Sequence, residues 1–228
     1  MTLTDPAELA RHIQHTLIEA DTTQERMVQH ARESVEWGFN AAMVAGSWVD
    51  VVASELEGTG VIVASALDFP TVGTMTSAGK AAEAAELVRL GAGQIDMGVQ
   101  IGWLKSGRFG EFRDDIARVV NAAGVPIKVM LELPLLTADE RLAAVELSLE
   151  AGAAYLKNAS SGAIETANPE GIAWLVEQAG GRALVKASGS IKSLDQVVSL
   201  IGAGASLVGT SAGIAIVTGA ASTATTSY

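Results

Sequence analysis

The 228-residue chain contains no cysteine, and this absence excludes several kinds of site. Without a thiol there is no disulfide framework, no thiolate nucleophile and no cysteine-ligated zinc. Histidine is also scarce: only His12, His15 and His30 occur, and their spacing matches no metal-ligand motif. The sequence therefore predicts neither a metal site nor a bound cofactor.

Basic residues are outnumbered, since 15 Lys and Arg face 26 Asp and Glu, for a formal net charge of −11. Binding to nucleic acid or to a membrane surface depends on clustered positive charge. The chain has no run of about 18 apolar residues, and its first residues lack the charged and apolar parts of a signal peptide. We therefore expect a soluble, cytoplasmic protein with no nucleic-acid or membrane partner.

Short apolar segments alternate along the chain with longer segments of helical period. The predicted strands are 16–18, 41–45, 61–67, 94–101, 127–133, 155–159, 183–188 and 207–211. The predicted helices are 22–37, 48–57, 76–90, 110–123, 137–151, 169–180 and 193–202, several of them ending in a small residue followed by glycine. Eight such units favour an α/β fold, a single (β/α)₈ TIM barrel over residues 1–217, rather than a doubly wound sheet. Residues 218–228, rich in Gly, Ala, Ser and Thr, are predicted to form a short flexible C-terminal tail.

Lysine is rare, yet three of the six lysines, Lys128, Lys157 and Lys186, fall within apolar strand segments. In the fourth and fifth segments the apolar residues occupy odd positions, so the even positions face the barrel axis. Asp96, Lys128 and Glu132 then point inward, and the next two strands contribute Lys157 and Lys186. We expect these charged side chains to share the barrel interior.

These buried charges have two interpretations. They can form a structural network, in which Asp96 pairs with a lysine and Glu132 with Lys128. Each buried ion, however, costs several kcal/mol unless it is fully satisfied, so several in one place favour a functional role. A lysine attacks a carbonyl only as the neutral amine, which burial or a neighbouring cation promotes. Paired lysines with a nearby aspartate therefore indicate a Schiff-base enzyme in which the carboxylate handles proton transfer.

Glycine- and serine-rich turns follow the sixth, seventh and eighth strand segments. In a barrel of this kind, the loops after strands 7 and 8 form the usual phosphate site through their backbone N–H groups. Such turns also serve as tight turns and helix caps without any ligand. The candidate phosphate-binding residues are Gly162, Gly189, Ser190, Gly209 and Ser211.

Eight motifs resemble, in order and spacing, those of the 2-deoxyribose-5-phosphate aldolases, over nearly the whole chain. They are His15-Thr16-Leu17, Asp68-Phe69-Pro70 with Gly73, Ile95-Asp96-Met97, Leu104-Lys105-Ser106-Gly107, Lys128-Val129-Met130-Leu131-Glu132, Leu156-Lys157, Val185-Lys186-Ala187-Ser188-Gly189 and Gly209-Thr210-Ser211-Ala212-Gly213. The C-terminal Ser227-Tyr228 is similar to the tail of some members. After Lys157, the chain has Asn158-Ala159-Ser160-Ser161 where the family usually has Thr-Ser-Thr-Gly.

The resemblance implies a class I, metal-independent aldolase that reversibly cleaves 2-deoxy-D-ribose 5-phosphate to acetaldehyde and D-glyceraldehyde 3-phosphate. It implies that Lys157 forms the Schiff base, that Lys186 perturbs the pKa of that lysine, and that Asp96 shuttles protons with an ordered water. Tyr228 would assist proton transfer at the acetaldehyde carbon. It also implies that Gly189, Ser190, Gly209 and Ser211 hold the phosphate. Gly162 stays a candidate from its place in the turn after the sixth segment, and Lys128 and Glu132 are expected to be supporting residues.

Two alternatives stay open. One is a related imine-forming aldolase of the same superfamily that acts on a different or unphosphorylated aldehyde. The other is a non-catalytic barrel that binds a sugar phosphate. The expected ligands are small sugar phosphates and aldehydes, and the sequence leaves a homodimer open.

Overall fold

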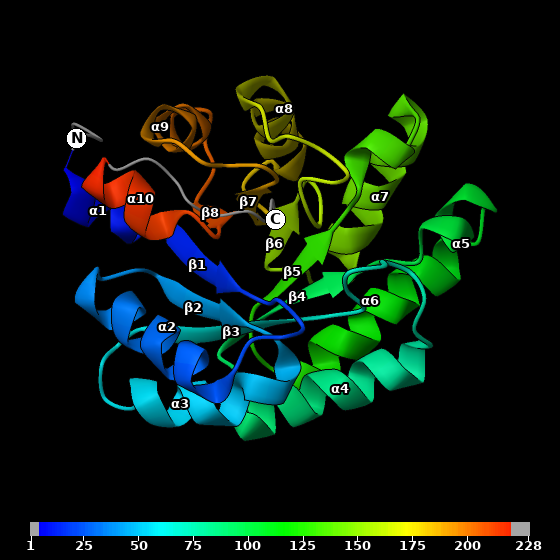
Figure 1. Cartoon of the computed structure of the whole chain (residues 1–228). Coiled ribbons are helices and arrows are strands. Elements are labelled where there is room, and N and C mark those ends of the chain that lie inside the picture. The colour runs from blue at the N-terminus through cyan, green and yellow to red at the C-terminus, as the bar shows by residue number, and fades with distance from the viewer. Residues whose placement is uncertain (1–4, 220–228) are drawn as a thin grey trace.

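The described part of the computed structural model, residues 5–219, is built on a closed barrel of eight parallel strands (Figure 1). Each strand pairs with its neighbours in sequence, and β8 closes the barrel against β1. The strands are β1 (Ile13–Leu17), β2 (Ala41–Val44), β3 (Ile62–Leu67), β4 (Gln94–Gly98), β5 (Ile127–Met130), β6 (Tyr155–Lys157), β7 (Leu184–Ser188) and β8 (Leu207–Thr210). The predicted (β/α)₈ TIM barrel is confirmed.

Helices connect the strands and form a layer around the outside of the barrel (Figure 1). The seven predicted helices are present, each with ends within two residues of the prediction. They are α2 (Gln24–Glu36), α3 (Val49–Leu56), α4 (Ser77–Leu90), α6 (Phe109–Ala123), α7 (Ala138–Glu150), α8 (Pro169–Ala179) and α9 (Leu194–Gly202).

The predictions differ from the structure in the short elements and at strand ends. The sequence did not predict α1 (Pro6–Ala10), α5 (Ile101–Lys105), α10 (Gly213–Thr218) or the two 3₁₀ turns η1 (Gly46–Trp48) and η2 (Leu133–Leu135). Helices this short carry too few turns to show a period. Thr218 ends α10 rather than beginning a tail, and β1 starts three residues before the predicted segment. Residues 220–228, which include Tyr228, lie outside the described residues, so the flexible tail stays a prediction.

The two faces of the barrel wall differ in chemistry. Outward side chains such as Ile95 and Val129 are fully buried beneath the helices and belong to the main hydrophobic core. Inside the barrel, β2 and β3 contribute a small separate apolar cluster of Ala41, Met43 and Ala64. Other interior positions, on β1 and on β4 to β7, carry buried polar and charged side chains. Burial of the outer face, at about 25 cal/mol per Å² of apolar surface, offsets the cost of this charged interior.

Predicted helix boundaries have identifiable side-chain and backbone causes, as α4 illustrates. Thr76 caps its first turn by accepting the backbone N–H of Gly79 at 3.1 Å. Gly91 ends the helix in the left-handed conformation, with φ of 115°. A Cβ at that position would lie only 2.5 Å from the Cβ of Ala53 on α3. Glycine is therefore required both by the backbone and by the packing of α4 against α3.

Candidate active site

A single buried carboxylate in the middle of the barrel holds three lysines. Asp96 Oδ2 accepts hydrogen bonds from Lys157 Nζ at 2.9 Å and from Lys186 Nζ at 2.7 Å. The other oxygen, Oδ1, lies 3.1 Å from Lys128 Nζ, in an ion pair that lacks good hydrogen-bond geometry. The structure thus brings together four of the five charged side chains that were expected to share the barrel interior; the fifth, Glu132, is not part of the cluster.

Strand register explains why these side chains meet. Asp96 on β4 pairs with Lys128 on β5, and Lys157 on β6 pairs with Lys186 on β7. Met130 on β5 pairs with Lys157, and its Sδ lies 3.6 Å from the amine. Lys128 pairs instead with Tyr155, so Lys157 lies one inward position beyond Lys128. The four strands therefore place their charges at adjacent inward positions, and the long lysine side chains meet at Asp96.

Burial and the excess of amines set the protonation of the cluster. The exposed fraction is 0% for the Asp96 and Lys128 side chains, 1% for Lys186 and 5% for Lys157. Burial opposes ionisation of Asp96, but the charges of the three lysines outweigh it and hold the pKa of Asp96 well below its usual range. Burial is also the largest cause of the lowered pKa of Lys186 and of Lys128, and the shift of Lys186 is the strong one. In both lysines the attraction of Asp96 opposes this shift. The site therefore favours an ionised Asp96 beside a neutral Lys186 amine.

Gln14 on β1 belongs to this cluster, although the sequence did not single it out. Its side-chain oxygen accepts a hydrogen bond from Lys186 Nζ at 2.7 Å, and its amide donates to Gln94 Oε1 at 2.8 Å. It was missed because the predicted first strand began at Thr16. Three polar residues in a row, Gln14 to Thr16, separate Ile13 from Leu17, so no apolar alternation marked this strand in the sequence.

A small cavity lies beside two of the lysines, where the strands end. Its volume is about 20 Å³, enough for about one water molecule. Lys157 and Lys186 both line it, whereas Lys128 does not. The lining residues are Thr16, Ile18, Met43, Ala66, Phe69, Lys157, Ser160, Lys186, Ser188 and Gly209.

Glu132 lies beyond the end of β5, in the left-handed conformation with φ of 51°. Its Oε1 accepts the backbone N–H of Ser160 at 2.8 Å, and within residues 5–219 its buried Oε2 has no hydrogen-bond partner. Burial raises the pKa of this carboxyl. The pairing of Glu132 with Lys128 that the structural interpretation of the sequence offered is not seen, because Lys128 pairs with Asp96 instead.

The residues predicted to bind phosphate lie at the same edge of the barrel as the cavity. Gly162 is in the turn after β6, Gly189 and Ser190 follow β7, Gly209 is within β8, and Ser211 directly follows β8. A Cβ at Gly209 would lie 3.0 Å from Lys186 Cε. The glycine therefore leaves room for the lysine within the strand layer, a role that its glycine-rich turn did not suggest.

Asn158, the residue after Lys157, links the β6 loop to β7. Its Oδ1 accepts the N–H of Ser188 at 2.9 Å, and its Nδ2 donates to the Ser188 carbonyl at 3.0 Å. The same Nδ2 donates to Glu165 Oε2 at 2.8 Å. The buried amide thus continues the pairing of β6 with β7 beyond Lys157 and Lys186, which holds the two lysines in register.

Comparison with known proteins adds a family to this geometry. No family model matches the chain. The deoxyribose-phosphate aldolase of Methanothermobacter thermautotrophicus is 42% identical over 213 residues, which cover 93% of this chain and 95% of the relative. That of Brevibacillus brevis is 40% identical over 214 residues, covering 93% and 96%. The chain belongs to the deoxyribose-phosphate aldolase family. It is therefore an enzyme of the carbon–carbon lyase class.

Solved structures agree with this assignment of the aldolase. QR15, an aldolase, matches with a TM-score of 0.86 at 29% identity, over 93% of this chain and 95% of that one. The deoxyribose phosphate aldolase of Aeropyrum pernix, described as a unique tetramer, matches with a TM-score of 0.86 at 28% identity, over 94% and 91%. The likeness covers nearly the full barrel in both cases.

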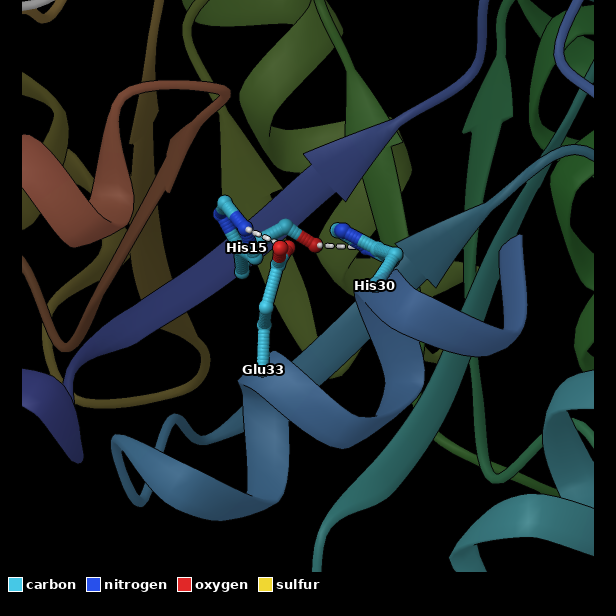
Figure 2. Close-up of side chains that lie close together, drawn as sticks. All are labelled: His15, His30 and Glu33. Atoms are coloured by element: carbon cyan, nitrogen blue, oxygen red, sulfur yellow. Dashed lines mark hydrogen bonds and ion pairs between the residues drawn. The ribbon is translucent and has the colours of Figure 1, made fainter. Parts of the chain in front are cut away.

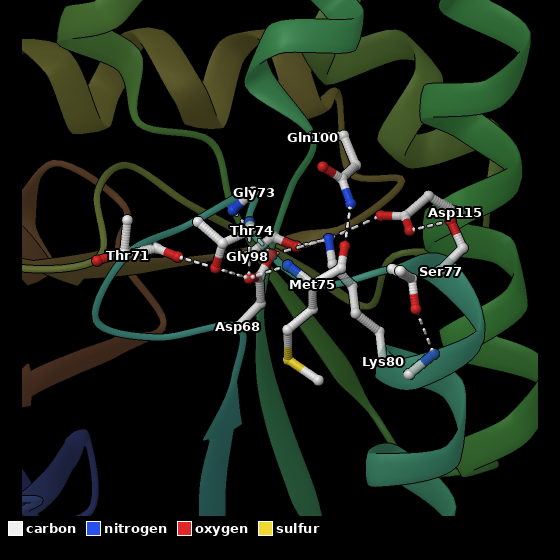
Figure 3. Close-up of polar contacts among 12 residues, drawn as sticks. Asp68, Thr71, Gly73, Thr74, Met75, Ser77, Lys80, Gly98, Gln100 and Asp115 are labelled. Atoms are coloured by element: carbon white, nitrogen blue, oxygen red, sulfur yellow. Dashed lines mark hydrogen bonds and ion pairs between the residues drawn. The ribbon is translucent and has the colours of Figure 1, made fainter.

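A second buried cluster in the aldolase lies beside the loop that follows β3 (Figure 3). Lys80 on α4 lies 3.0 Å from Asp68 Oδ2 and 2.9 Å from Asp115 Oδ2, and it donates to the Gly98 carbonyl at 2.7 Å. Ser77 donates to the other oxygen of Asp115 at 2.6 Å. The lysine and both carboxylates have no exposed side-chain surface, so these ions are paired entirely within the protein.

Asp68 fixes the loop itself. Its carboxylate accepts the backbone N–H groups of Gly73 at 2.8 Å and of Thr74 and Met75 at 3.0 Å each. These donors and Lys80 together outweigh burial and lower the pKa of Asp68. Phe69, the next residue, lines the cavity beside the catalytic lysine candidates. The cluster therefore positions one wall of the aldolase site.

Removing the cation of this cluster is expected to unfold the loop and weaken the whole fold. Lys80→Met leaves Asp68 and Asp115 buried without a counter-ion, and the expected loss of unfolding free energy is about 3–5 kcal/mol. Urea denaturation followed by circular dichroism measures this loss. The matched control is Lys105→Met, which removes a half-exposed pair with Glu140 and costs at most about 1 kcal/mol. Equal losses for the two variants would contradict the role given to Lys80.

Proposed function

We propose that the aldolase reversibly cleaves 2-deoxy-D-ribose 5-phosphate to acetaldehyde and D-glyceraldehyde 3-phosphate through a Schiff base on Lys157. The observation that carries this proposal is the Asp96 carboxylate, whose Oδ2 accepts hydrogen bonds from Lys157 and Lys186 at one cavity. Two amines that share one acceptor can exchange a proton through it. The family membership supplies the substrate class.

Lys157 is the amine best placed to be the nucleophile. It lines the cavity, and its side chain is the most exposed of the three lysines around Asp96. Lys186, whose lowered pKa favours the neutral amine, accepts the Lys157 proton by way of Asp96 Oδ2. The neutral Lys157 then attacks C1 of the open-chain sugar, and loss of water from the carbinolamine gives the imine.

The imine draws electrons from the C2–C3 bond. When a base removes the proton of the C3 hydroxyl, the C2–C3 bond breaks, C3 becomes the aldehyde of glyceraldehyde 3-phosphate, and C1 and C2 remain on Lys157 as the enamine. Protonation at C2 and hydrolysis release acetaldehyde and restore the amine. Asp96 and one water in the cavity would carry these protons, since the cavity has room for about one water molecule. Tyr228, proposed to assist at C2, lies outside the described residues.

The phosphate is proposed to bind at the ends of β6, β7 and β8, where the five candidate residues lie. Just before α9, the N–H groups of Lys192 and Ser193 already donate to Gln196 Oε1 at 2.8 and 3.1 Å. The donors would come instead from the turn at Gly189 and Ser190 and from the segment after β8. Lys128 and Glu132 would support the site by holding Asp96 and the β6 loop.

The use of these two N–H groups by Gln196 also favours a second candidate function. An anion site with fewer backbone donors suits an imine-forming aldolase whose substrate is a different or unphosphorylated aldehyde. Both candidate functions use the same nucleophilic lysine. They differ in how much the phosphate group of the substrate contributes to binding. The comparison of phosphorylated with unphosphorylated sugar, given below, separates them.

Location and assembly stay predictions. Within residues 5–219 no helix is both long and apolar enough to cross a membrane. A cytoplasmic location is proposed from composition, and a homodimer stays open from the sequence. The tetramer is described for the Aeropyrum pernix protein.

Chemical trapping identifies the nucleophile. Sodium borohydride added in the presence of acetaldehyde is expected to reduce the imine and to leave an ethyl group on Lys157, located by peptide mass spectrometry. Lys186 lines the same cavity and Lys105 is half-exposed, so both serve as internal controls for unselective labelling. An adduct on Lys186 in place of Lys157, or no adduct at either, rejects the proposed nucleophile.

Replacing the proton acceptor is expected to slow turnover without unfolding the barrel. Lys186→Met keeps the volume but removes the amine, so kcat should fall at least 100-fold, in the range of about 10²–10⁴ typical of acid–base groups. The lowered pKa of Lys186 means that the amine gains its proton only as the pH falls, so the wild-type rate should drop on the acid side. That acid limb should disappear in the variant. A wild-type rate for a folded Lys186→Met enzyme would show that the relay is not needed.

The turn after β7 is expected to decide how much the phosphate contributes. Gly189 has φ of 118°, and a Cβ there would lie 2.0 Å from the Glu165 carbonyl oxygen, so Gly189→Ala must displace the turn. We expect KM for deoxyribose 5-phosphate to rise at least 10-fold and KM for deoxyribose to change little. Gly181→Ala is the control, because Gly181 also has positive φ (76°) but its Cβ would meet open space. If the wild-type enzyme shows no preference for the phosphorylated sugar, the second candidate function is the correct one.

A further inference from the structure

Two histidines and a glutamate meet outside the barrel, between β1 and α2 (Figure 2). His15 is on β1, and His30 and Glu33 are three positions apart on α2, which places them on one face of that helix. Figure 2 shows the Glu33 carboxylate directed at the His15 ring and the His30 ring directed at the His15 backbone. The spacing of the histidines along the chain matches no metal-ligand motif, but the fold brings these three side chains together.

The distances among these three side chains fit three ligands of one metal ion better than they fit direct hydrogen bonds between the side chains. One ring nitrogen of each histidine and one carboxylate oxygen lie within 4.8 Å of one another. His15 Nε2 and Glu33 Oε2 are 3.8 Å apart, too far for a hydrogen bond. Two ligands on one tetrahedral zinc, each about 2.0–2.1 Å from the metal, are about 3.4 Å apart. Small side-chain movements would therefore complete the geometry.

The histidine nitrogens are buried and unsatisfied. His15 is 3% exposed and His30 is fully buried. Within residues 5–219, three of the four ring nitrogens have no hydrogen-bond partner: both nitrogens of His15 and Nδ1 of His30. A buried polar atom without a partner costs about 1–3 kcal/mol, and a bound ion would supply a partner to one nitrogen of each histidine.

The surroundings orient both imidazole rings. His30 Nε2 lies 3.1 Å from the His15 carbonyl oxygen, the kind of contact that orients a ligating ring. A Cβ at Gly213 would lie 2.9 Å from His15 Nδ1, so this side of the ring faces α10 and Nε2 faces Glu33.

Glu33 provides the route from solvent and a competing cation. Its side chain is 17% exposed, and Oε2 also pairs with Arg26 at 3.1 Å. Arg26 is 44% exposed and can move into solvent when an ion takes its place. Gln29 donates to the other oxygen, Oε1, at 3.3 Å, which leaves Oε2 for the metal.

We propose that His15, His30 and Glu33 bind one divalent transition-metal ion, Zn²⁺ or Co²⁺, with water in the fourth position. Two imidazoles and one carboxylate are a donor set for such ions and a poor one for Mg²⁺ or Ca²⁺, which prefer all-oxygen sites. The ion joins β1 to α2 and stabilises the fold. It lies on the outer face of β1, away from the lysine cavity, so it takes no part in the aldol chemistry.

Cobalt titration of the tag-free protein tests the site. Wild-type protein should bind one Co²⁺ with the visible absorption of a four-coordinate site, and Zn²⁺ should displace it and raise Tm. Glu33→Gln removes the partly exposed ligand and should weaken Co²⁺ binding at least 10-fold. Glu36→Gln, which makes the same charge change at an exposed position of α2, should bind as wild type does.

Two further variants make the outcome decisive. His30→Asn should also lose the spectrum, whereas Arg26→Gln should bind Co²⁺ more tightly because the competing cation is gone. Mg²⁺ at the same concentrations should leave Tm unchanged. The site does not exist if wild type and Glu33→Gln bind Co²⁺ equally, or if the wild-type protein shows no four-coordinate absorption. Either result would leave the trapping of Lys157 unaffected, so the two proposals fail separately.

Discussion

The aldolase interior depends on one carboxylate with too many amines around it. Asp96 can balance a single ammonium, yet three lysines lie within 3.1 Å of its oxygens, and all four side chains are nearly inaccessible to water. Ionised amines in such a place cost several kcal/mol each. The least costly state keeps Asp96 charged and lets an amine give up its proton. The excess of amines over carboxylates, which makes the buried cluster unfavourable, thus also favours the neutral amine that imine chemistry requires.

Much of this arrangement could be predicted because it follows from strand periodicity. Lysine within an apolar strand has to face the interior of the barrel, and neighbouring parallel strands place inward residues close together. That reasoning located Asp96, Lys128, Lys157 and Lys186 without any three-dimensional information. It was wrong about the ends of the strands. Glu132 lies past β5 in a left-handed turn, a conformation that no period reveals.

Contacts that depend on distant parts of the chain could not be predicted. Gln14 contacts Lys186, 172 positions away, and Lys80 reaches a carboxylate on α6. His15 and His30 are 15 positions apart in the sequence. Only the packing of α2 on β1 makes their rings neighbours. Spacing rules find metal ligands when they share one element; ligands split between a strand and a helix leave no such pattern.

The two buried ion clusters show why similar charges serve different purposes. Around Asp68, two carboxylates share one ammonium, but the excess negative charge is matched by three backbone N–H groups on Asp68 and by a hydroxyl on Asp115. Every charge there is paired, so the cluster fixes a loop. Around Asp96 the excess is positive, because three amines share one carboxylate. Burial and the charges of the other two lysines lower the pKa of Lys186, although Asp96 and Gln14 both accept hydrogen bonds from it. The sign of the excess charge in a buried place is therefore what separates the reactive cluster from the structural one.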